Sequence, residues 1–252
     1  MEELKYTGER IVSGEKTLLP MRIENLARYQ FFAARMGGGK ILDLGCGDGE
    51  GTGYLRGLAD WDVYSIDIAA DAVRFASKTY GGMGRGVIAR VDVRRLAFEA
   101  SAFDGIISVE VIEHIEHPEV YLSEARRVLK ENGVFGLTTP NRLRTAPARC
   151  QGSSWRAHVR EYSPSELINM TARYFPHVEL WGEQIPVYEA NIFRKFMRKL
   201  APVFKRILPN GLRIRALPTL QYLIKSHLEI NDIEFSKDNI DQKPTLVVIC
   251  KK

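Results

Sequence analysis

Residues 41–55 read ILDLGCGDGEGTGYL, and glycine occupies every second position from 45 to 53 in this stretch. Glycine loses more conformational freedom on folding than any other residue, so five alternating glycines indicate a requirement that only glycine meets. A tight turn and a close approach of backbone to ligand are two such requirements. Because Asp43 and an apolar run precede the glycines, the stretch predicts a strand followed by a ligand-binding loop.

Short β-rich runs alternate with helical patterns along the chain, which favours an α/β fold with parallel strands joined by crossover helices. Two predicted helices cover 71–80 and 118–130, and a third begins at Ser163, where Ser-Pro-Ser-Glu forms a capping box. The predicted strands are apolar enough to be buried on both faces. Their sequences are KILDL, DVYSID, GVIARVD, FDGIISV and GVFGLTT.

Composition indicates one large globular domain, because 45% of the 252 residues are hydrophobic and 27% are charged. The chain holds no run of about 20 apolar residues, and its N-terminus lacks the basic start and apolar run of a signal peptide. The three cysteines, Cys46, Cys150 and Cys250, form no CxxC pair that would suggest zinc or a redox couple. We therefore expect a cytoplasmic protein.

The glycine loop matches neither of two common phosphate-binding motifs. A P-loop requires Lys-Ser or Lys-Thr after its last glycine, and this loop has neither. The dinucleotide fingerprint G-x-G-x-x-G fails because Glu50 or Thr52 stands where glycine is required. The carboxylate of Asp43 favours a ligand with an ammonium or other cation over a pyrophosphate. Asp67, at the end of the next predicted strand, can accept both hydroxyls of a ribose.

These stretches resemble the class I S-adenosylmethionine-dependent methyltransferases. ILDLGCGDGEG is similar to their glycine-rich first motif, YSIDIA to their ribose-binding acid, and VDV to their adenine-contacting turn. Residues 103–141 resemble the region that runs from strand four through strand five of this family. The resemblance covers most of the chain and implies a Rossmann-like, doubly wound sheet of seven strands, mostly parallel with an antiparallel last strand.

The resemblance also implies S-adenosylmethionine as the cofactor and a set of residues around it. Gly45 and Gly47 would let the backbone pass against its methionyl and ribose parts, while Asp43 orients the loop and attracts the amino group. Asp67 would hold the ribose hydroxyls, with Ile68 against the adenine face. The other residues expected there are Asp92 and Val93 at the adenine, Val109 and Glu110 beside the methionine chain, Cys46 as a small buried filler, and Arg10, either a partner of the cofactor carboxylate or a solvated arginine.

The segment VEVIEHIEHP, after the fourth predicted strand, supplies candidate proton acceptors. Methyl transfer to a hydroxyl requires alignment of nucleophile, methyl and sulfur, and removal of one proton. Histidine titrates near neutral pH, so His114 is a candidate general base. The alternative is that these charged residues solvate and cap the next helix, because acidic side chains favour helix N-termini.

Glu110, Glu113 and His114 are also candidate ligands of a divalent cation, with the later His158 completing the set. One helical turn would direct the first three to one side of the cofactor's methyl group. We expect His158 on the same side of the methyl group, as a catalytic residue or a metal ligand. The pattern E-x-x-E-H with a later histidine resembles that of magnesium-using small-RNA 2′-O-methyltransferases and of quinone-ring O-methyltransferases. It implies an oxygen-rich Mg²⁺ site.

The stretch from TTPNR to GEQIP resembles a narrower bacterial and archaeal group associated with sugar, glycan and lipid-carrier biosynthesis. It shares with that group a Thr-Pro-Asn at the end of strand five and His-x-x-Glu-Tyr-Ser, here residues 158–163. The longer Arg-rich loop, 142–160, departs from the group's pattern. The resemblance implies O-methylation of a small-molecule, sugar, glycan or lipid-linked acceptor.

We expect a single methyltransferase domain, 1–252, with a helical arm at 1–39, a cofactor-binding core at 40–185, a basic helical cap at 186–240 and a last strand at 244–251. From 191 to 228 the cap has nine lysines and arginines and no acidic residue. Its cationic face predicts contact with an anionic membrane surface, a phosphate-bearing acceptor or RNA. The simpler interpretation is that its apolar face packs on the domain's own core. Aromatic residues are sparse among the cations, which weakens the RNA interpretation.

Three functions from different classes fit these observations. The first is an O-methyltransferase for a small-molecule, glycan or lipid-linked acceptor, and the second is an RNA methyltransferase of the 2′-O type. The third is a cofactor-binding protein without catalytic activity. We favour the first, because the sequence fills every cofactor position that the resemblance predicts.

Overall fold

The computed structural model describes residues 19–58, 61–144, 158–185 and 229–252. Arg10, the middle of the Arg-rich loop and most of the expected basic cap therefore lie outside the described residues. The arm is described from the start of its helix onward, and the expected cofactor-binding core is described apart from two short gaps.

The fold is organised around one mixed sheet with strand order β3-β2-β1-β4-β5-β8-β6-β7. Its neighbours pair in parallel from β3 to β5, whereas β8 is antiparallel to both β5 and β6. The strands are β1 (Gly39–Leu44), β2 (Trp61–Asp67), β3 (Ile88–Arg90), β4 (Phe103–Val109), β5 (Leu129–Pro140), β6 (His177–Gln184), β7 (Glu234–Ser236) and β8 (Thr245–Lys251). The predicted doubly wound α/β sheet with an antiparallel last strand is confirmed.

The sheet has eight strands where the sequence predicts seven. The additional strand is β7, which pairs antiparallel with Gly182–Gln184 at the end of β6. It lies in the region expected to be a helical cap, of which residues 229–240 instead include the 3-10 turn η2 (Ile230–Asp232) and this strand. A three-residue strand is too short to show an alternating sequence pattern. It nevertheless pairs with backbone groups at the end of β6 that would otherwise be exposed at the sheet edge.

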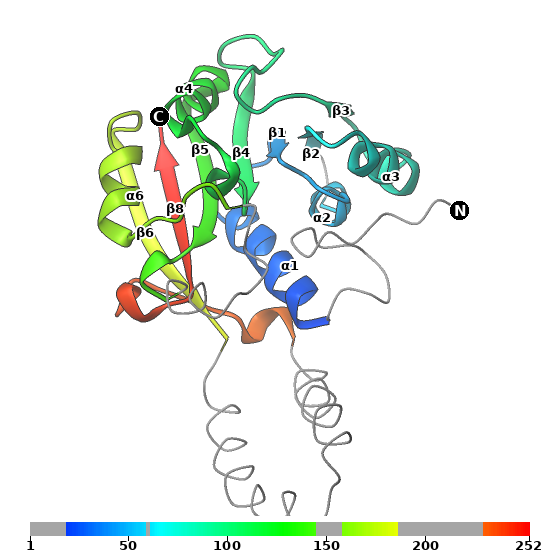
Figure 1. Ribbon diagram of the computed structural model, residues 1–252. Coiled ribbons are helices and arrows are strands. Elements are labelled where there is room, and N and C mark those ends of the chain that lie inside the picture. The colour runs from blue at the N-terminus through cyan, green and yellow to red at the C-terminus, as the bar shows by residue number, and fades with distance from the viewer. Residues whose placement is uncertain (1–18, 59–60, 145–157, 186–228) are drawn as a thin grey trace, which may run out of the picture.

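Helices cover both faces of the sheet (Figure 1). Those of one face are α1, α2 and α3, and those of the other are α4 and α6. They span α1 (Leu19–Ala33), α2 (Glu50–Arg56), α3 (Ala70–Tyr80), α4 (Pro118–Val128) and α6 (Pro164–Thr171), with 3-10 turns η1 (Ile112–His114) and η3 (Ile240–Gln242). None of the described helices combines the length and apolar character that crossing a membrane requires.

The central strands feed two hydrophobic cores. Successive side chains of a strand point to opposite faces. Accordingly Ile41 packs in the core under α1 and α2, while Leu42 packs in the core under α4 and α6. In β4 the order is reversed, with Ile106 on the α4 side and Ile107 on the α1 side. This double burial explains why the strands read as continuous apolar runs.

Two glycines of the loop stretch lie within α2 and make room for tyrosines. A Cβ added at Gly51 would lie 2.0 Å from Cζ of Tyr29, and one at Gly53 would lie 2.5 Å from Cδ1 of Tyr80. These glycines therefore allow α1 and α3 to pack closely against α2.

The loop is anchored by the fully buried carboxylate of Asp43 at the end of β1. The Tyr29 hydroxyl of α1 donates to Oδ1 at 2.8 Å, and the Thr52 hydroxyl of α2 donates to Oδ2 at 2.7 Å. Thr52 also contacts the Ser65 hydroxyl of β2 at 2.9 Å. Burial raises the pKa of Asp43 to about 6, although both hydrogen bonds lower it. One carboxylate thus joins α1, α2 and the two central strands.

We predict that Gly51→Ala destabilises the protein by about 1–3 kcal/mol, because its methyl group overlaps the Tyr29 ring in a packed interface. Gly37→Ala is the matched control, since a Cβ there meets nothing within 4 Å. Its free energy of unfolding should change by less than about 0.5 kcal/mol. Urea unfolding of both variants checks the difference, and equal midpoints would contradict the close packing of α1 on α2.

We predict that Asp43→Asn changes how stability depends on pH. Because the folded pKa, about 6, exceeds the ordinary 3.8, the folded state binds the proton more tightly between these values. This contribution is fully present below pH 3.8 and is lost as pH rises through about 6. In the wild type it should amount to about 3 kcal/mol, and the variant should lack it.

Urea unfolding from pH 4 to pH 7 measures this effect, with Asp238→Asn as a control at an exposed aspartate. The control should follow the wild type. An Asp43→Asn variant that follows it as well would show that the buried carboxyl does not titrate in this range.

Candidate cofactor and acceptor site

The candidate site lies where the parallel strands end. Because β1, β2, β4 and β5 run in the same direction, their carboxyl ends meet at one edge of the sheet. Asp43, Asp67 and Glu110 stand at or just after three of these ends, and Thr138 lies near the fourth. The structure thus brings together residues that are up to 95 positions apart in the sequence.

Gly47 is the part of the glycine loop that is open to a ligand. Its φ is +55°, and a Cβ at this position would meet no atom of the described residues within 4 Å. Its N–H donates to Oδ2 of Asp67 at 2.9 Å, while Oδ1 of Asp67 accepts from the Ala69 N–H at 2.8 Å. The loop backbone and the Asp67 carboxylate therefore line the same opening.

Gly45 and Cys46 face the protein. A Cβ at Gly45, whose φ is +86°, would lie 2.4 Å from Cγ2 of Val111, so protein packing excludes a side chain there. Cys46 is buried, and burial raises the pKa of its thiol well above the ordinary value. A protonated, buried thiol suits the expected filler role.

Asp43 has no exposed surface, and both of its oxygens accept hydrogen bonds from protein hydroxyls. Its expected orienting role agrees with this geometry. The expected attraction of an amino group would have to act through the field of the buried charge, because the carboxylate does not reach the opening.

The residues expected at the adenine have different environments. Ile68, next to Asp67, is 57% exposed and presents an apolar surface. Val93 is instead buried in the core on the α4 side, because the turn directs its side chain inward. Asp92 binds Arg94 through both oxygens, and this hydrogen bonding holds the pKa of Asp92 below its usual value.

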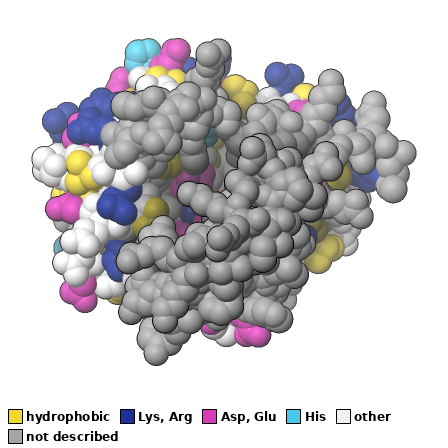
Figure 2. All heavy atoms as spheres, turned by 60° about the horizontal axis from the view of Figure 1, so that its bottom comes forward, with side chains coloured by type: hydrophobic (Ala, Val, Ile, Leu, Met, Phe, Trp, Pro, Cys, Tyr) yellow, Lys and Arg dark blue, Asp and Glu magenta, His cyan; other side chains and the backbone are white. Residues whose placement is uncertain are grey.

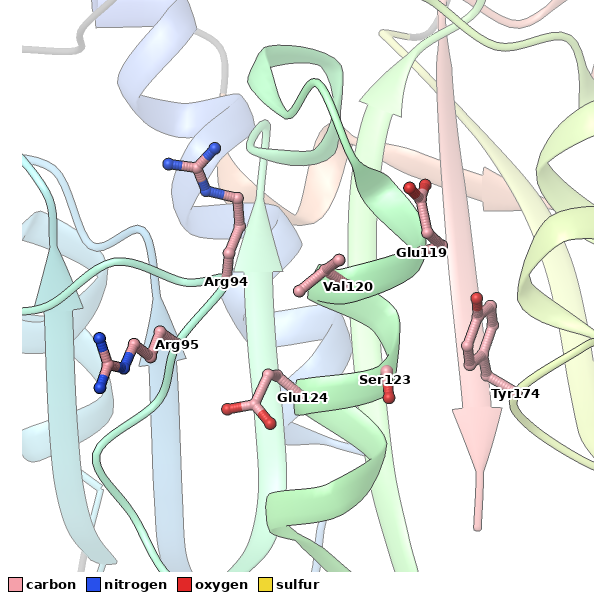
Figure 3. A pocket seen from close by; sticks show the side chains of 7 residues that line it. All are labelled: Arg94, Arg95, Glu119, Val120, Ser123, Glu124 and Tyr174. Carbon is pink, nitrogen blue, oxygen red and sulfur yellow. The ribbon is translucent and has the colours of Figure 1, made fainter.

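Arg94 also lines a surface hollow between α4 and the turn after β3, with Val120 and Tyr174 on its other walls (Figure 3). This hollow contains none of the residues predicted to bind the cofactor or the acceptor.

Glu110 turns the chain out of the sheet and is held inside the site. Its φ of +55° is rare for a residue with a side chain. Its Oε1 accepts from the Thr138 hydroxyl at 2.9 Å and lies 3.6 Å from Nη1 of Arg28. Val109, the residue before it, is buried in the core on the α1 side. Strain at such a position is characteristic of functional sites.

Arg28 is a site residue that the sequence does not reveal. It lies on α1 and is buried against Glu183 of β6, with its Nε 2.6 Å from Oε2. Its Nη2 also donates to Thr245 of β8 at 3.3 Å. Burial lowers the pKa of Arg28, but the charges of Glu183 and Glu110 outweigh burial and keep it above the ordinary value. No local pattern predicts a pair whose members are 155 positions apart.

Three of the four expected metal ligands come together. The candidate ligand atoms of Glu113, His114 and His158 lie within 4.8 Å of one another. Glu110 lies outside this group, contrary to the sequence prediction. The prediction assumed a helical turn from 110 to 114, whereas the turn η1 begins at Ile112 and Glu110 forms a bend with positive φ directly after β4.

Glu113 is the buried member of this group. It has no exposed surface, and its Oε2 accepts from the Thr139 hydroxyl at 3.0 Å. Its Oε1 has no hydrogen-bond partner among the described residues. Burial, followed by the charge of Glu110, raises the pKa of Glu113 well above its ordinary value. An unpaired buried oxygen is a position at which a cation or a polar ligand group would be stabilised.

The two histidines of the group come from different segments. Their ring centroids lie 4.9 Å apart. The segment of His158 is held against η1, because the N–H groups of Val159 and Arg160 donate to the Glu113 carbonyl at 2.8 and 3.1 Å. The predicted capping box at Ser163 is present directly downstream and begins α6.

Comparison with known proteins identifies the domain. Residues 42–137 match a family model described as a methyltransferase domain. A probable S-adenosylmethionine-dependent methyltransferase of Mycolicibacterium smegmatis is 31% identical over 174 residues, covering 66% of this chain and 63% of that protein. A ubiquinone biosynthesis O-methyltransferase of Xanthomonas axonopodis pv. citri is 32% identical, covering 50% of this chain and 54% of that protein. The matches thus span about three fifths or less of these relatives.

Solved structures show the same fold. An S-adenosylmethionine-dependent methyltransferase of Thermotoga maritima, described as a possible histamine N-methyltransferase, has a TM-score of 0.63 at 16% identity and covers 93% of this chain and 92% of its own. Phosphoethanolamine N-methyltransferase 2 of Haemonchus contortus, in complex with S-adenosyl-L-methionine, has a TM-score of 0.61 at 17% identity, covering 92% of this chain and 56% of its own. The matched domain, the relatives and the shared fold make this chain similar to S-adenosylmethionine-dependent methyltransferases, with the family match at residues 42–137.

Proposed function

We propose that the protein transfers a methyl group from S-adenosylmethionine to a hydroxyl of a small-molecule acceptor, with a glycan or lipid-linked compound as the preferred class. The proposal rests on two features that lie at the same edge of the sheet. The first is the opening between Gly47 and Asp67, and the second is the group of Glu113, His114 and His158.

The residues at the opening fit the cofactor. The space beside Gly47 accepts the close passage of a ligand, and Asp67 offers carboxylate oxygens to the ribose hydroxyls. The exposed face of Ile68 suits the adenine ring. Asp92 can accept a hydrogen bond from the adenine amine only if its carboxylate does so in addition to its hydrogen bonds from Arg94. The bound cofactor would supply an electrophilic methyl on a sulfonium, and the chain's task is to align the acceptor and take its proton.

The histidines carry the proton-transfer part of the proposal. An imidazole is an effective general base near neutral pH, and two imidazoles stand beside the buried Glu113. We assign one of two roles to His114 and His158. They either remove the proton of the acceptor hydroxyl or bind an ion that makes this hydroxyl more acidic.

The same group fits a metal ion, although not the expected oxygen-rich magnesium site. The donors within 4.8 Å are one carboxylate and two imidazoles. Imidazole suits Zn²⁺, Fe²⁺ and similar ions, whereas Mg²⁺ favours oxygen ligands. Since Glu110 is engaged by Thr138 and Arg28, we propose Glu113, His114 and His158 as the ligands of a transition-metal dication.

The acceptor class rests on one group of relatives and on the composition of the basic cap. The similarity to proteins named ubiquinone biosynthesis O-methyltransferases favours oxygen as the methylated atom. On the face shown in Figure 2, Lys and Arg side chains lie among Asp and Glu wherever residues are described. A peripheral membrane contact therefore rests on the composition of the basic cap, whose nine lysines and arginines between 191 and 228 lie outside the described residues.

We predict that Asp67→Ala weakens binding of S-adenosylmethionine by about 1–3 kcal/mol, because the ribose hydroxyls lose their acceptor. Titration calorimetry measures the change, and Asp238→Ala, at an exposed position of the loop after β7, is the control. The control should bind like the wild type. A wild-type protein that binds neither the cofactor nor its demethylated product would refute the proposed function.

We predict that a chelator stops methyl transfer and that Mn²⁺ or Zn²⁺ restores it more fully than Mg²⁺. Labelled S-adenosylmethionine and extracts separated into lipid, glycan, RNA and small-molecule fractions provide the assay. His114→Ala and His158→Ala should each lower the rate roughly a hundredfold. Turnover that persists in chelator would rule out a required metal ion. Unchanged turnover in both histidine variants would also rule out a histidine as the general base. Methyl label found in the RNA fraction alone would show that the acceptor is RNA and not a small-molecule, glycan or lipid-linked compound.

A further inference from the structure

A buried carboxylate lies directly behind His158. Nδ1 of His158 is 3.0 Å from Oε1 of Glu161, and their side chains are 4% and 1% exposed. A buried carboxylate at this distance from an imidazole is held by its surroundings rather than by chance contact at a surface. The contact places Glu161 beside a residue of the Glu113 group, on the side of its Nδ1.

The chemistry of this pair determines which nitrogen of His158 can react. A carboxylate oxygen accepts a hydrogen bond, so Nδ1 carries the proton that it donates. The lone pair of the neutral imidazole then resides on Nε2. The contact therefore selects one tautomer and one ring orientation.

The backbone around Glu161 is built to hold this geometry. The Arg142 N–H donates to the carbonyl of Tyr162 at 3.0 Å, which ties this segment to the end of β5. The capping box of Ser163 and Glu166 then starts α6 at Pro164, three positions after Glu161. The N–H groups of Val159 and Arg160, the two residues after His158, donate to the Glu113 carbonyl. The segment that follows His158 is thus held by backbone hydrogen bonds, and Glu161 contacts its ring.

We propose that Glu161 is a positioning residue of the methyltransferase site, which holds His158 with Nε2 as its reactive or metal-binding atom. This inference rests on the proposed function for its consequence, but the orientation of the ring can be tested without any methyl transfer. A partner behind a reacting or ligating histidine commonly contributes tenfold to a hundredfold in activity or metal affinity.

The chain contains a matched control pair of the same chemistry. Nδ1 of His117 lies 3.3 Å from Oε1 of Glu119, but these side chains are 65% and 56% exposed at the start of α4. An exposed contact of this kind has little effect on its histidine, because water competes for the same atoms. Glu161→Gln and Glu119→Gln therefore remove equivalent carboxylates from a buried and an exposed pair.

The first measurement is the tautomer of His158 by long-range proton–nitrogen NMR of histidine-labelled protein in chelator. We expect the Nδ1–H form in the wild type and in Glu119→Gln. In Glu161→Gln the amide can donate as well as accept, so the Nε2–H form should appear. A wild-type His158 in the Nε2–H form, or the same tautomer in Glu161→Gln as in the wild type, would overturn the proposal.

The second measurement is steady-state transfer. Glu161→Gln should lower kcat roughly tenfold to a hundredfold and leave the KM for S-adenosylmethionine unchanged, because the cofactor opening is not altered. Glu161→Asp, which keeps a carboxylate on a shorter stem, should recover part of the loss, and Glu119→Gln should match the wild type. Wild-type kcat in Glu161→Gln would contradict the proposal.

The two proposals fail in different ways. If the wild type binds no S-adenosylmethionine by calorimetry, the proposed function falls, whatever the tautomer of His158. If the cofactor binds and methyl transfer occurs but the ring orientation does not depend on Glu161, only the positioning role falls. Thermal unfolding of each variant identifies one that fails to fold, in which case the wild-type tautomer alone decides.

Discussion

The site depends on one buried charge. Asp43 ends β1 with no exposed surface, and a carboxylate removed from water is costly unless hydrogen bonds replace its hydration. Tyr29 of α1 and Thr52 of α2 supply those bonds, so the helix before the loop and the helix after it are joined at the same atom group. The five glycines then have separate purposes. Gly51 admits the Tyr29 ring to its position, whereas Gly47 keeps open the space that faces a ligand. The loop can approach a cofactor closely because the packing behind it is fixed.

The other end of the site is organised by β5. Thr138 and Thr139 are neighbours in this strand, and their hydroxyls hold Glu110 and Glu113, respectively. β5 pairs with β4 on one side and β8 on the other, so both hydroxyls stand on the rigid centre of the sheet. Asn141, which ends the Thr-Pro-Asn motif, donates to the Lys243 carbonyl at 2.8 Å and so holds the segment that leads into β8. A short motif thereby positions two acids and the return of the chain.

The sequence predicts the parts of this structure whose causes are local. Continuous apolar runs indicate strands buried on both faces, and the capping box at Ser163 indicates the start of a helix, because both patterns involve neighbouring residues. The structure leaves Glu110 outside the group of Glu113, His114 and His158, because whether residues 110–114 form one helical turn depends on packing beyond the segment. Arg28 and Glu183 escape sequence reasoning for the same reason, as their pairing exists only once α1 lies across the sheet. The roles assigned to the cofactor-contacting residues stay predictions.

The placement of charge limits what the site can do. Arg28 stands between Glu183 and Glu110, so its positive charge is already matched by two carboxylates and is not available in full to an anionic acceptor. Glu113 adds a carboxyl whose pKa is raised by burial and by Glu110, and it would gain most from a cation or a donor hydroxyl. Under the proposed function, the charges of the described residues would suit a neutral acceptor that presents a hydroxyl, or a metal ion, better than a group that carries phosphate. Any contact with an anionic part of the acceptor must then lie outside this group, and the composition of the basic cap makes residues 191–228 the place to seek it.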